Sequence, residues 1–476
     1  MSTGIPSENP YLSLYMAKRT DRLQLGGMLM NFPGGNWRYP GAENHRFLDI
    51  SHYIEVAQTL ERGGFDFIFF ADKLAVPGRS PDREAGSLRT GTWGSAAPDP
   101  AIIVSALAAT TKRIGLAYTI STSYHHPFNV ARTLGTLDHL SGGRAAWNVV
   151  TSHEDAEAQN FGLDQQLQRS DRYERAEEFL ETVFGLWDTW EDNAVVHDRE
   201  RNIVIDPEKV HPLNHQGDHF RVRGPLNLPR PPQGNPVIAQ AGSSERGREF
   251  AARWAEVIFT PQPNLEVAQT FYRDVKARLA KHNRKEEDLK ILPGVFVVVG
   301  ETEAIAQEKE ALLQEGVDVK QALAQLSSMV EKDLRGYSPD EPAAPLIANV
   351  TVNGMQGHVQ ALYAAASKDN LTLGQLARRV ATGLTFAKFI GSPVQIADQI
   401  EQWFEAYACD GFIIRSGYSP GMAEFARLVV PELRRRNLFR ASYKGKTLRD
   451  HLHLARPERH AWRKRLTPRQ SLQVAA

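Results

Sequence analysis

Cysteine is nearly absent from this chain, since Cys409 is the only one in 476 residues. A single thiol excludes an intrachain disulfide and a cysteine-rich metal site. The composition therefore fits a protein of the reducing cytoplasm.

Targeting and membrane-spanning segments are also missing. The N-terminus MSTGIPSENPYLSLYMAKRT has no basic stretch followed by an apolar one, and no run of about 18 apolar residues occurs anywhere. Neither a signal peptide nor a transmembrane helix is expected.

The chain has no excess of either charge, with 56 Lys and Arg against 56 Asp and Glu. No overall field favours nucleic acid or an anionic membrane, so a small molecule is the expected partner. Regular short repeats are absent too, which argues against a solenoid. The sequence contains no G-x-S-x-G, G-x-x-x-x-G-K-[ST] or H-E-x-x-H motif, so serine-hydrolase, P-loop and zincin chemistry lack their usual support.

What the sequence does contain is a recurring alternation of a short apolar run and a helical pattern. This alternation is typical of parallel strands covered by helices. Eight strands are predicted, at 22–31, 65–72, 113–122, 144–152, 235–242, 255–260, 291–300 and 410–416.

Helical patterns lie between these runs, as at 45–64 and 172–187. In the second, one apolar face is expected to pack against the outside of a barrel, through Ala176, Phe179, Leu180, Val183, Phe184 and Trp187. Eight strand-helix units predict an α/β fold, a TIM (β/α)8 barrel, with its ligand site where the strands end. The polar strand ends expected to converge there are Asp72, Asn148, Thr151, Ser152, Gly242 and Ser243.

Several excursions interrupt the pattern. Residues 73–99 are rich in Gly, Pro and Ser and are predicted to be an irregular loop at the barrel mouth. Residues 190–234 contain the possible strands RNIVID and HFRVRG, and 301–390 is predicted as a helical, lid-like insertion between strands seven and eight. The basic arm 438–476 is expected to wrap another surface or a neighbouring subunit. A chain of 476 residues is compatible with one large barrel domain that has insertions and equally with three separate domains.

The turn after the fifth predicted strand carries the strongest physical signal for a binding site. Gly242, Ser243 and Ser244 stand between a strand and a helix, where free backbone amides and the helix dipole favour a phosphate. The alternative is that the serines only cap the helix. Arg169 stands just before a predicted helix and Tyr173 in its first turns, and both have groups that can donate to a phosphate. The alternative is that Tyr173 continues the apolar face and Arg169 is solvated.

Other polar residues at predicted strand ends have two readings as well. Asp72 either orients a ligand or ties down its loop. His125 and His126 follow the third strand and either position a ligand or shuttle protons, although their adjacency argues against a metal site. Trp37 and Arg38 follow the first strand and either reach the mouth or anchor a loop.

Five segments resemble the bacterial-luciferase-like flavin monooxygenases. The resemblance is to the branch of the nitrilotriacetate, EDTA, dibenzothiophene-sulfone and pristinamycin-synthase monooxygenases, and it runs from about residue 20 to 455. The segments are TLDHLSGGRAAWNVVTS (136–152), NFG (160–162), RYERAEEFL (172–180), HFRVRGPLNLPRPPQGNPVIAQAGSSERGREFAA (219–252) and VVPELRRRNLFR (429–440).

The resemblance implies one TIM-barrel domain, 1–476, that uses reduced FMN. It places Asp72 and Thr119 near the isoalloxazine ring and Asn148 near the polar edge of the flavin. It places Arg169, Tyr173, Gly242, Ser243 and Ser244 around the phosphate, with Arg169 standing where relatives often have histidine. No metal is implied.

The reaction implied by the resemblance is insertion of one oxygen atom of O2 into a small organic substrate. A separate NAD(P)H:flavin reductase would supply the reduced FMN, which agrees with the absence of a G-x-G-x-x-G fingerprint. A homodimer or homotetramer is expected. The substrate stays open, because Arg79, Arg83 and Arg89 favour an anion and Trp93 an aromatic. Two alternatives also stay open: a deazaflavin-dependent oxidoreductase on the same barrel, and a non-catalytic flavin-binding protein.

Overall fold

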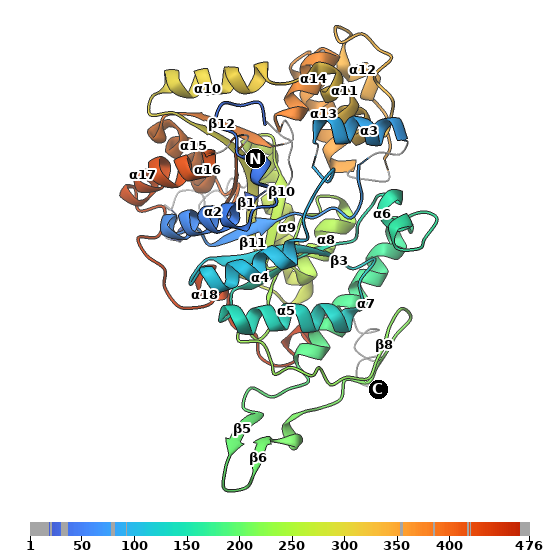
Figure 1. The fold of residues 1–476 in the computed structure, drawn as a ribbon, viewed down its shortest axis with the longest axis vertical. Coiled ribbons are helices and arrows are strands. Elements are labelled where there is room, and N and C mark those ends of the chain that lie inside the picture. Colours follow the sequence, from blue (N-terminus) through green and yellow to red (C-terminus); the bar gives the residue numbers. More distant parts are fainter. Residues whose placement is uncertain are drawn as a thin grey trace, which may run out of the picture.

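A closed parallel barrel is the centre of the molecule (Figure 1). The computed structural model describes residues 19, 21–29, 37–77, 81–91, 93–352, 356–383, 386–416, 418 and 420–466. The eight barrel strands, in order around the barrel, are β1 (Gln24–Leu29), β2 (Phe67–Phe70), β3 (Gly115–Ser121), β4 (Ala145–Val150), β9 (Val237–Gln240), β10 (Val257–Pro261), β11 (Lys290–Val299) and β13 (Gly411–Arg415). β13 pairs with β1 and closes the barrel. The predicted TIM barrel is confirmed, and each strand lies within one residue of its predicted range.

Helices cover the outside of the barrel between consecutive strands. They are α2 (Ile50–Gly63), α4 (Pro100–Thr110), α5 (Pro127–Ser141), α6 (Asp155–Asn160), α7 (Arg169–Trp187), α8 (Glu245–Trp254), α9 (Leu265–Arg278), α15 (Pro393–Glu405), α16 (Gly421–Glu424), the π-helical turn η5 (Phe425–Val429) and α17 (Val430–Arg435); the 3-10 turns are η1 (Asn44–Arg46), η3 (Leu279–His282) and η4 (Glu286–Asp288). Helix α5 shows how local sequence sets the bounds. It starts with Pro127 in the first turn and ends at Gly142, whose φ of 70° is left-handed. The predicted apolar face of α7 is buried.

The insertion between β11 and β13 has a core of its own. It contains α10 (Glu303–Glu315), α11 (Val319–Met329), α12 (Ala343–Ile347), α13 (Gln356–Lys368), α14 (Leu373–Ala381) and β12 (Ala387–Gly391). The insertion is mostly helical, as predicted, but its end forms strand β12, which the sequence analysis did not select and which pairs with β11 along the edge that β10 leaves at Pro261. The predicted irregular loop 73–99 also contains a helix, α3 (Pro81–Thr90), which lies beside the insertion in Figure 1.

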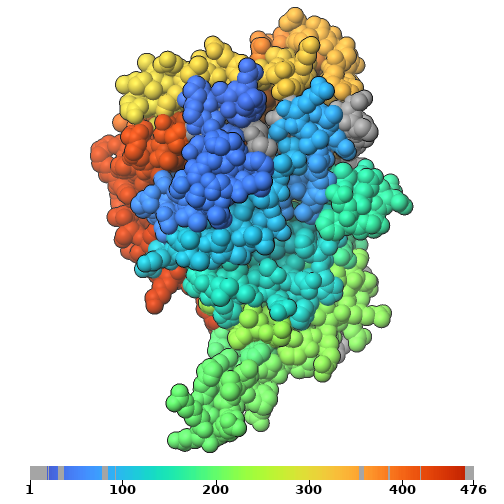
Figure 2. Space-filling view, in the orientation of Figure 1, coloured from blue at the N-terminus to red at the C-terminus, as the bar shows by residue number. Residues whose placement is uncertain are grey.

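The segment 190–234 forms two small hairpins instead of joining the barrel. They are β5 (Val195–Asp198) with β6 (Ile203–Ile205), followed by the turn η2 (Pro207–Lys209), and β7 (His215–Gln216) with β8 (Arg221–Val222). The two predicted strands contain β6 and β8. In Figure 2 the green β5–β6 hairpin extends from the end of the molecule opposite the insertion.

The C-terminal arm closes the end of the barrel where the strands begin. It includes α18 (Leu448–His451) and η6 (Ala461–Arg465). Leu448, Leu452 and Leu454 pack in the barrel interior with residues such as Phe67 and Val257. The described part of the arm therefore wraps its own barrel, the first of the two alternatives. None of the described helices is long and apolar enough to cross a membrane.

Candidate functional site

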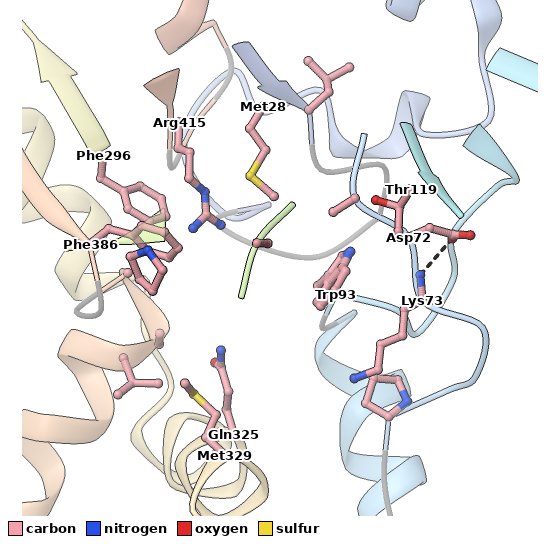
Figure 3. Close-up of a pocket in the computed structure, with 18 of the residues that line it drawn as sticks. Met28, Asp72, Lys73, Trp93, Thr119, Phe296, Gln325, Met329, Phe386 and Arg415 are labelled. Carbon is pink, nitrogen blue, oxygen red and sulfur yellow. Dashed lines mark hydrogen bonds between the residues drawn. The ribbon is translucent and has the colours of Figure 1, made fainter. Parts of the chain in front are cut away.

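A cavity of about 1520 Å³ opens at the C-terminal ends of the barrel strands. Its walls come from strand ends and the loops after them, from α3, and from α11, which contributes Gln325 and Met329 (Figure 3). The insertion 301–390 and the segment 73–99 thus both shape the cavity, as the sequence predicts.

All eight residues singled out as cofactor contacts line this one cavity: Asp72, Thr119, Asn148, Arg169, Tyr173, Gly242, Ser243 and Ser244. Thr151 and Ser152 line it too. The barrel topology brings these groups together from four successive strand-helix units, so the predicted convergence of polar strand ends is confirmed.

The turn between β9 and α8 forms a cradle at one side of the cavity. Ser244 caps α8, and its Oγ accepts the amide of Gly247 at 3.2 Å while keeping a hydroxyl proton to donate. A Cβ on Gly242 would lie 2.3 Å from Gln240 Nε2 and 3.1 Å from Gly247 Cα. A side chain at this position would have to displace Gln240 and crowd the backbone of Gly247, and glycine leaves the amides of the turn and of the first turn of α8 accessible.

Helix α7 adds polar groups beside this cradle. The Tyr173 hydroxyl lies 3.1 Å from the position a Cβ on Gly247 would take, and its ring packs edge-on against Phe250 with centroids 5.5 Å apart. The buried ring of Tyr173 continues the apolar face, as predicted, and its hydroxyl reaches the turn, where contact with a phosphate stays a prediction. Arg169 lines the cavity at the first residue of α7.

Arg172 is a cavity residue that the sequence analysis did not select. It is 5% exposed, one guanidinium nitrogen donates to the Ser152 carbonyl, and Nε is buried with no partner among the described residues. Burial lowers its pKa from the ordinary value. It lies three residues after Arg169 on the same side of α7, and this spacing was the available signal.

Asp72, Thr119 and Asn148 lie on neighbouring units of the barrel. Thr119 Oγ1 donates to the Phe70 carbonyl at 3.0 Å and accepts from Asn148 Nδ2 at 2.9 Å. Asp72 accepts the Lys73 amide at 2.8 Å, as a residue that ties its loop would, and burial raises the pKa of its carboxyl to about 6. Gln240 on β9 was missed by the sequence analysis; its Oε1 is a buried acceptor without a described partner.

The structure does not bring His125 and His126 to the cavity. His125 Nδ1 is 2.9 Å from the Ser121 carbonyl, and His126 caps α5 by accepting the Phe128 amide at 3.3 Å. The histidine that faces the cavity after β4 is His153, 3.9 Å from Glu154 Oε1, and burial lowers its pKa.

Aromatic and basic residues of the mouth loops complete the wall. Trp37, Arg38, Arg89 and Trp93 line the cavity, and Lys73 Nζ lies 5.4 Å from the centroid of the Trp93 ring. Arg79 and the side chain of Arg83 lie outside the described residues.

These donors and acceptors fit a flavin nucleotide. The cradle and Arg172 suit a terminal phosphate, while Gln240 Oε1 and Arg172 Nε are buried polar atoms that a bound ligand would satisfy. Pockets for one small molecule measure about 300–1,000 Å³, so the cavity of about 1520 Å³ has room for a cofactor and a substrate.

Comparison with known proteins agrees with this geometry. A family model described as luciferase-like monooxygenase matches residues 23–409. The chain is 46% identical over 441 residues to nitrilotriacetate monooxygenase component A of Aminobacter aminovorans, covering 91% of this chain and 96% of the relative. It is 43% identical over 426 residues to dibenzothiophene-sulfone monooxygenase of Rhodococcus erythropolis, covering 89% and 94%.

A solved structure matches the fold closely. The crystal structure of DmoA from Hyphomicrobium sulfonivorans superimposes with a TM-score of 0.82 at 33% identity, covering 91% of this chain and 92% of that one. The resemblance noted in the sequence is thereby confirmed. The chain belongs to the luciferase-like monooxygenase family and is a flavin-dependent monooxygenase.

Proposed function

We propose that this chain is the oxygenase component of a two-component monooxygenase that takes reduced FMN from a separate NAD(P)H:flavin reductase and inserts one atom of O2 into a small organic substrate. One observation carries the proposal. The eight residues assigned to FMN from the resemblance line a single cavity that also contains an anion cradle and unsatisfied buried polar atoms.

In this proposal the chain binds the phosphate through Ser243, Ser244 and Tyr173, with Arg169 and Arg172 supplying charge. Asp72 and Thr119 lie near the ring and Asn148 near its polar edge. When bound, reduced FMN supplies the electrons that activate dioxygen.

The chain's remaining task is to orient the ring and keep water away from it. The apolar residues Phe259, Phe296 and Phe386 form part of the wall, and α11 faces them from the insertion (Figure 3). His153, one of the two described histidines that line the cavity (the other is His52), is available to hold or move a proton in place of His125 and His126.

A separate reductase is part of the proposal for two reasons. The chain has no G-x-G-x-x-G nicotinamide fingerprint. The nitrilotriacetate relative is named a component A, which implies a further component. We also propose a homodimer or homotetramer, which light scattering of the purified protein tests.

Reconstitution tests the function. The protein is mixed with a generic flavin reductase, FMN, NADH and labelled ¹⁸O2, and offered panels of chelators, sulfones and alkanes. We expect substrate-dependent oxygen uptake and a product that carries one ¹⁸O atom. Hydride transfer without oxygen uptake would instead indicate the deazaflavin alternative, and FMN binding with no product from any panel would indicate a flavin-binding protein. The matched control omits this protein and keeps the reductase.

A further inference from the structure

A cation stands on the cavity wall away from the phosphate cradle. Arg415 is the last residue of β13, beside Phe296 of β11 in the strand register. Its guanidinium carbon lies 4.5 Å from the ring centroid of Phe296 and 4.3 Å from that of Phe386. In Figure 3 the guanidinium points into the pocket next to these two rings.

Arg415 is partly exposed to the cavity, and it lacks the partners that the fully buried arginines have. Within the described residues it makes no hydrogen bond and no ion pair, and its Nε is buried. Arg144, by contrast, donates to carbonyls and to the Thr111 hydroxyl, and Arg449 to the carboxylate of Glu256. The donors of Arg415 are thus left for something outside the chain.

The aromatic neighbours stabilise the charge of the Arg415 guanidinium but leave its N–H groups without hydrogen-bond acceptors. Rings attract the flat face of a guanidinium, but its N–H groups point outward along the edge and need acceptors. Burial lowers the pKa of Arg415 to about 10, so the side chain is still charged at neutral pH. A buried charge of this kind is costly until an anion pairs with it.

The anion in question is not the phosphate of the cofactor. In the barrel order, β10 and β11 separate the cradle strand β9 from β13. Figure 3 also shows Arg415 on the opposite side of the pocket from Asp72 and Thr119. The groups nearest Arg415 are apolar rings, Phe296 and Phe386, and Phe259 stacks on Phe386 with centroids 5.6 Å apart, so an anion there would be partly shielded from water.

We propose that Arg415 binds a carboxylate of the substrate and that the enzyme selects small organic acids over neutral compounds of the same size. The planar fork of an arginine held between two rings matches a carboxylate in bidentate geometry. A neutral substrate would leave the cation buried and unpaired, which is the strongest form of rejection that a polar pocket offers. This inference rests on the proposed function, and it narrows the substrate class.

Binding to the FMN-loaded protein tests the inference without turnover. Isothermal titration compares nitrilotriacetate with its trimethyl ester and 3-(methylthio)propionate with its methyl ester. In the unaltered protein we expect at least one acid to bind about 10- to 100-fold more tightly than its ester. Arg415→Met should abolish this preference, and Arg415→Lys should restore part of it, because lysine keeps the charge and loses the fork.

Two controls separate the inference from folding and from cofactor binding. Arg335→Met removes another cavity-wall cation, one already paired with Asp333 at 2.8 Å, and should leave acid binding unchanged. Thermal unfolding and FMN affinity are measured for every variant. The unfolding temperature should stay within a few degrees of that of the unaltered protein, and the FMN affinity within about twofold.

Three results would overturn the inference: no acid preference in either pair, an acid preference that survives Arg415→Met, or a loss of FMN affinity as the main effect of that substitution. Reconstituted turnover then distinguishes the two proposals. Products from neutral substrates alone would contradict the carboxylate site and would still support the proposed monooxygenase function. Acid binding that depends on Arg415, with no oxygenated product from any compound, would support the carboxylate site and contradict the proposed monooxygenase function.

Discussion

The two ends of the barrel differ in how their buried charged groups are paired. At the end where strands begin, three buried acids each stand directly before a strand and accept a backbone amide from another strand. Asp66 accepts from Leu25, Glu256 from Ile238 and Asp410 from Ile291. At the end where strands finish, Arg172, Gln240 and Arg415 each keep a buried polar atom without a partner among the described residues.

The cations that neutralise the acids come largely from the C-terminal arm. Arg440 pairs with Asp66, and Arg449 holds Glu256 with two nitrogens at 2.8 and 2.9 Å. Asp410 pairs with Lys276 at 3.0 Å and with Arg19 at 3.2 Å, and these cations help to hold its pKa down to about 2. We call the end where strands begin the satisfied end, because its buried acids are paired, although both ring nitrogens of His451 there lack a described partner. We call the cavity end the unsatisfied end, and we expect ligands to complete its hydrogen bonding.

The largest effect should come from breaking the satisfied end. Arg449→Met leaves Glu256 buried and unpaired, so the free energy of unfolding should fall by about 3–5 kcal/mol, while FMN affinity of the folded variant stays unchanged. Chemical unfolding measures the change. Arg456→Met is the matched control, because its ion pair with Asp192 is exposed and worth under about 1 kcal/mol. Equal losses in the two variants would contradict the comparison.

A substitution at the unsatisfied end should do the opposite. Gly242→Val places its Cβ against Gln240 and Gly247 and displaces the turn, so FMN affinity should fall about 100-fold, which is the contribution of one or two charge-assisted hydrogen bonds. Fluorescence titration measures it. Gly336→Val, at a position with no neighbour within 4 Å, should bind FMN normally. Unchanged affinity in Gly242→Val would remove the turn from the site.

Asp72, at the unsatisfied end, should make the free energy of unfolding depend on pH. Because burial raises its pKa from 3.8 to about 6, the folded protein binds more protons than the unfolded chain between these values. Its contribution to stability therefore falls as pH rises through this window. Above about pH 6, Asp72→Asn should be more stable than the unaltered protein by on the order of 1–2 kcal/mol, with solvent in the cavity reducing the full effect. Unfolding curves from pH 4 to 8 would contradict this if the two proteins kept a constant difference.

The smallest effect compares two serine caps. Ser244 caps α8 at the cavity, and Ser392 caps α15 away from it. Either serine replaced by alanine should cost about 1 kcal/mol of stability. Only Ser244→Ala should also weaken FMN binding. If both variants or neither variant weakened FMN binding, Ser244 would act only as a helix cap.

The sequence predicted the parts of this molecule that depend on local pattern. Apolar runs located all eight barrel strands, and the Gly-Ser-Ser turn located the cradle, because both are properties of a few adjacent residues. Strand β12 was missed because its pairing depends on where β10 ends. Arg415 was missed for a similar reason: at the end of DGFIIRS it looks like an ordinary solvated arginine until Phe386, from the insertion, covers it.

The direct test of the cradle is the ratio of FMN affinity to riboflavin affinity, since the two ligands differ only in the phosphate. The account predicts that the unaltered protein binds FMN at least about 100-fold more tightly than riboflavin. The double variant Arg172→Met, Ser243→Ala should bind both ligands nearly equally, with its riboflavin affinity unchanged. A ratio near one in the unaltered protein, or a ratio that the double variant keeps, would contradict it.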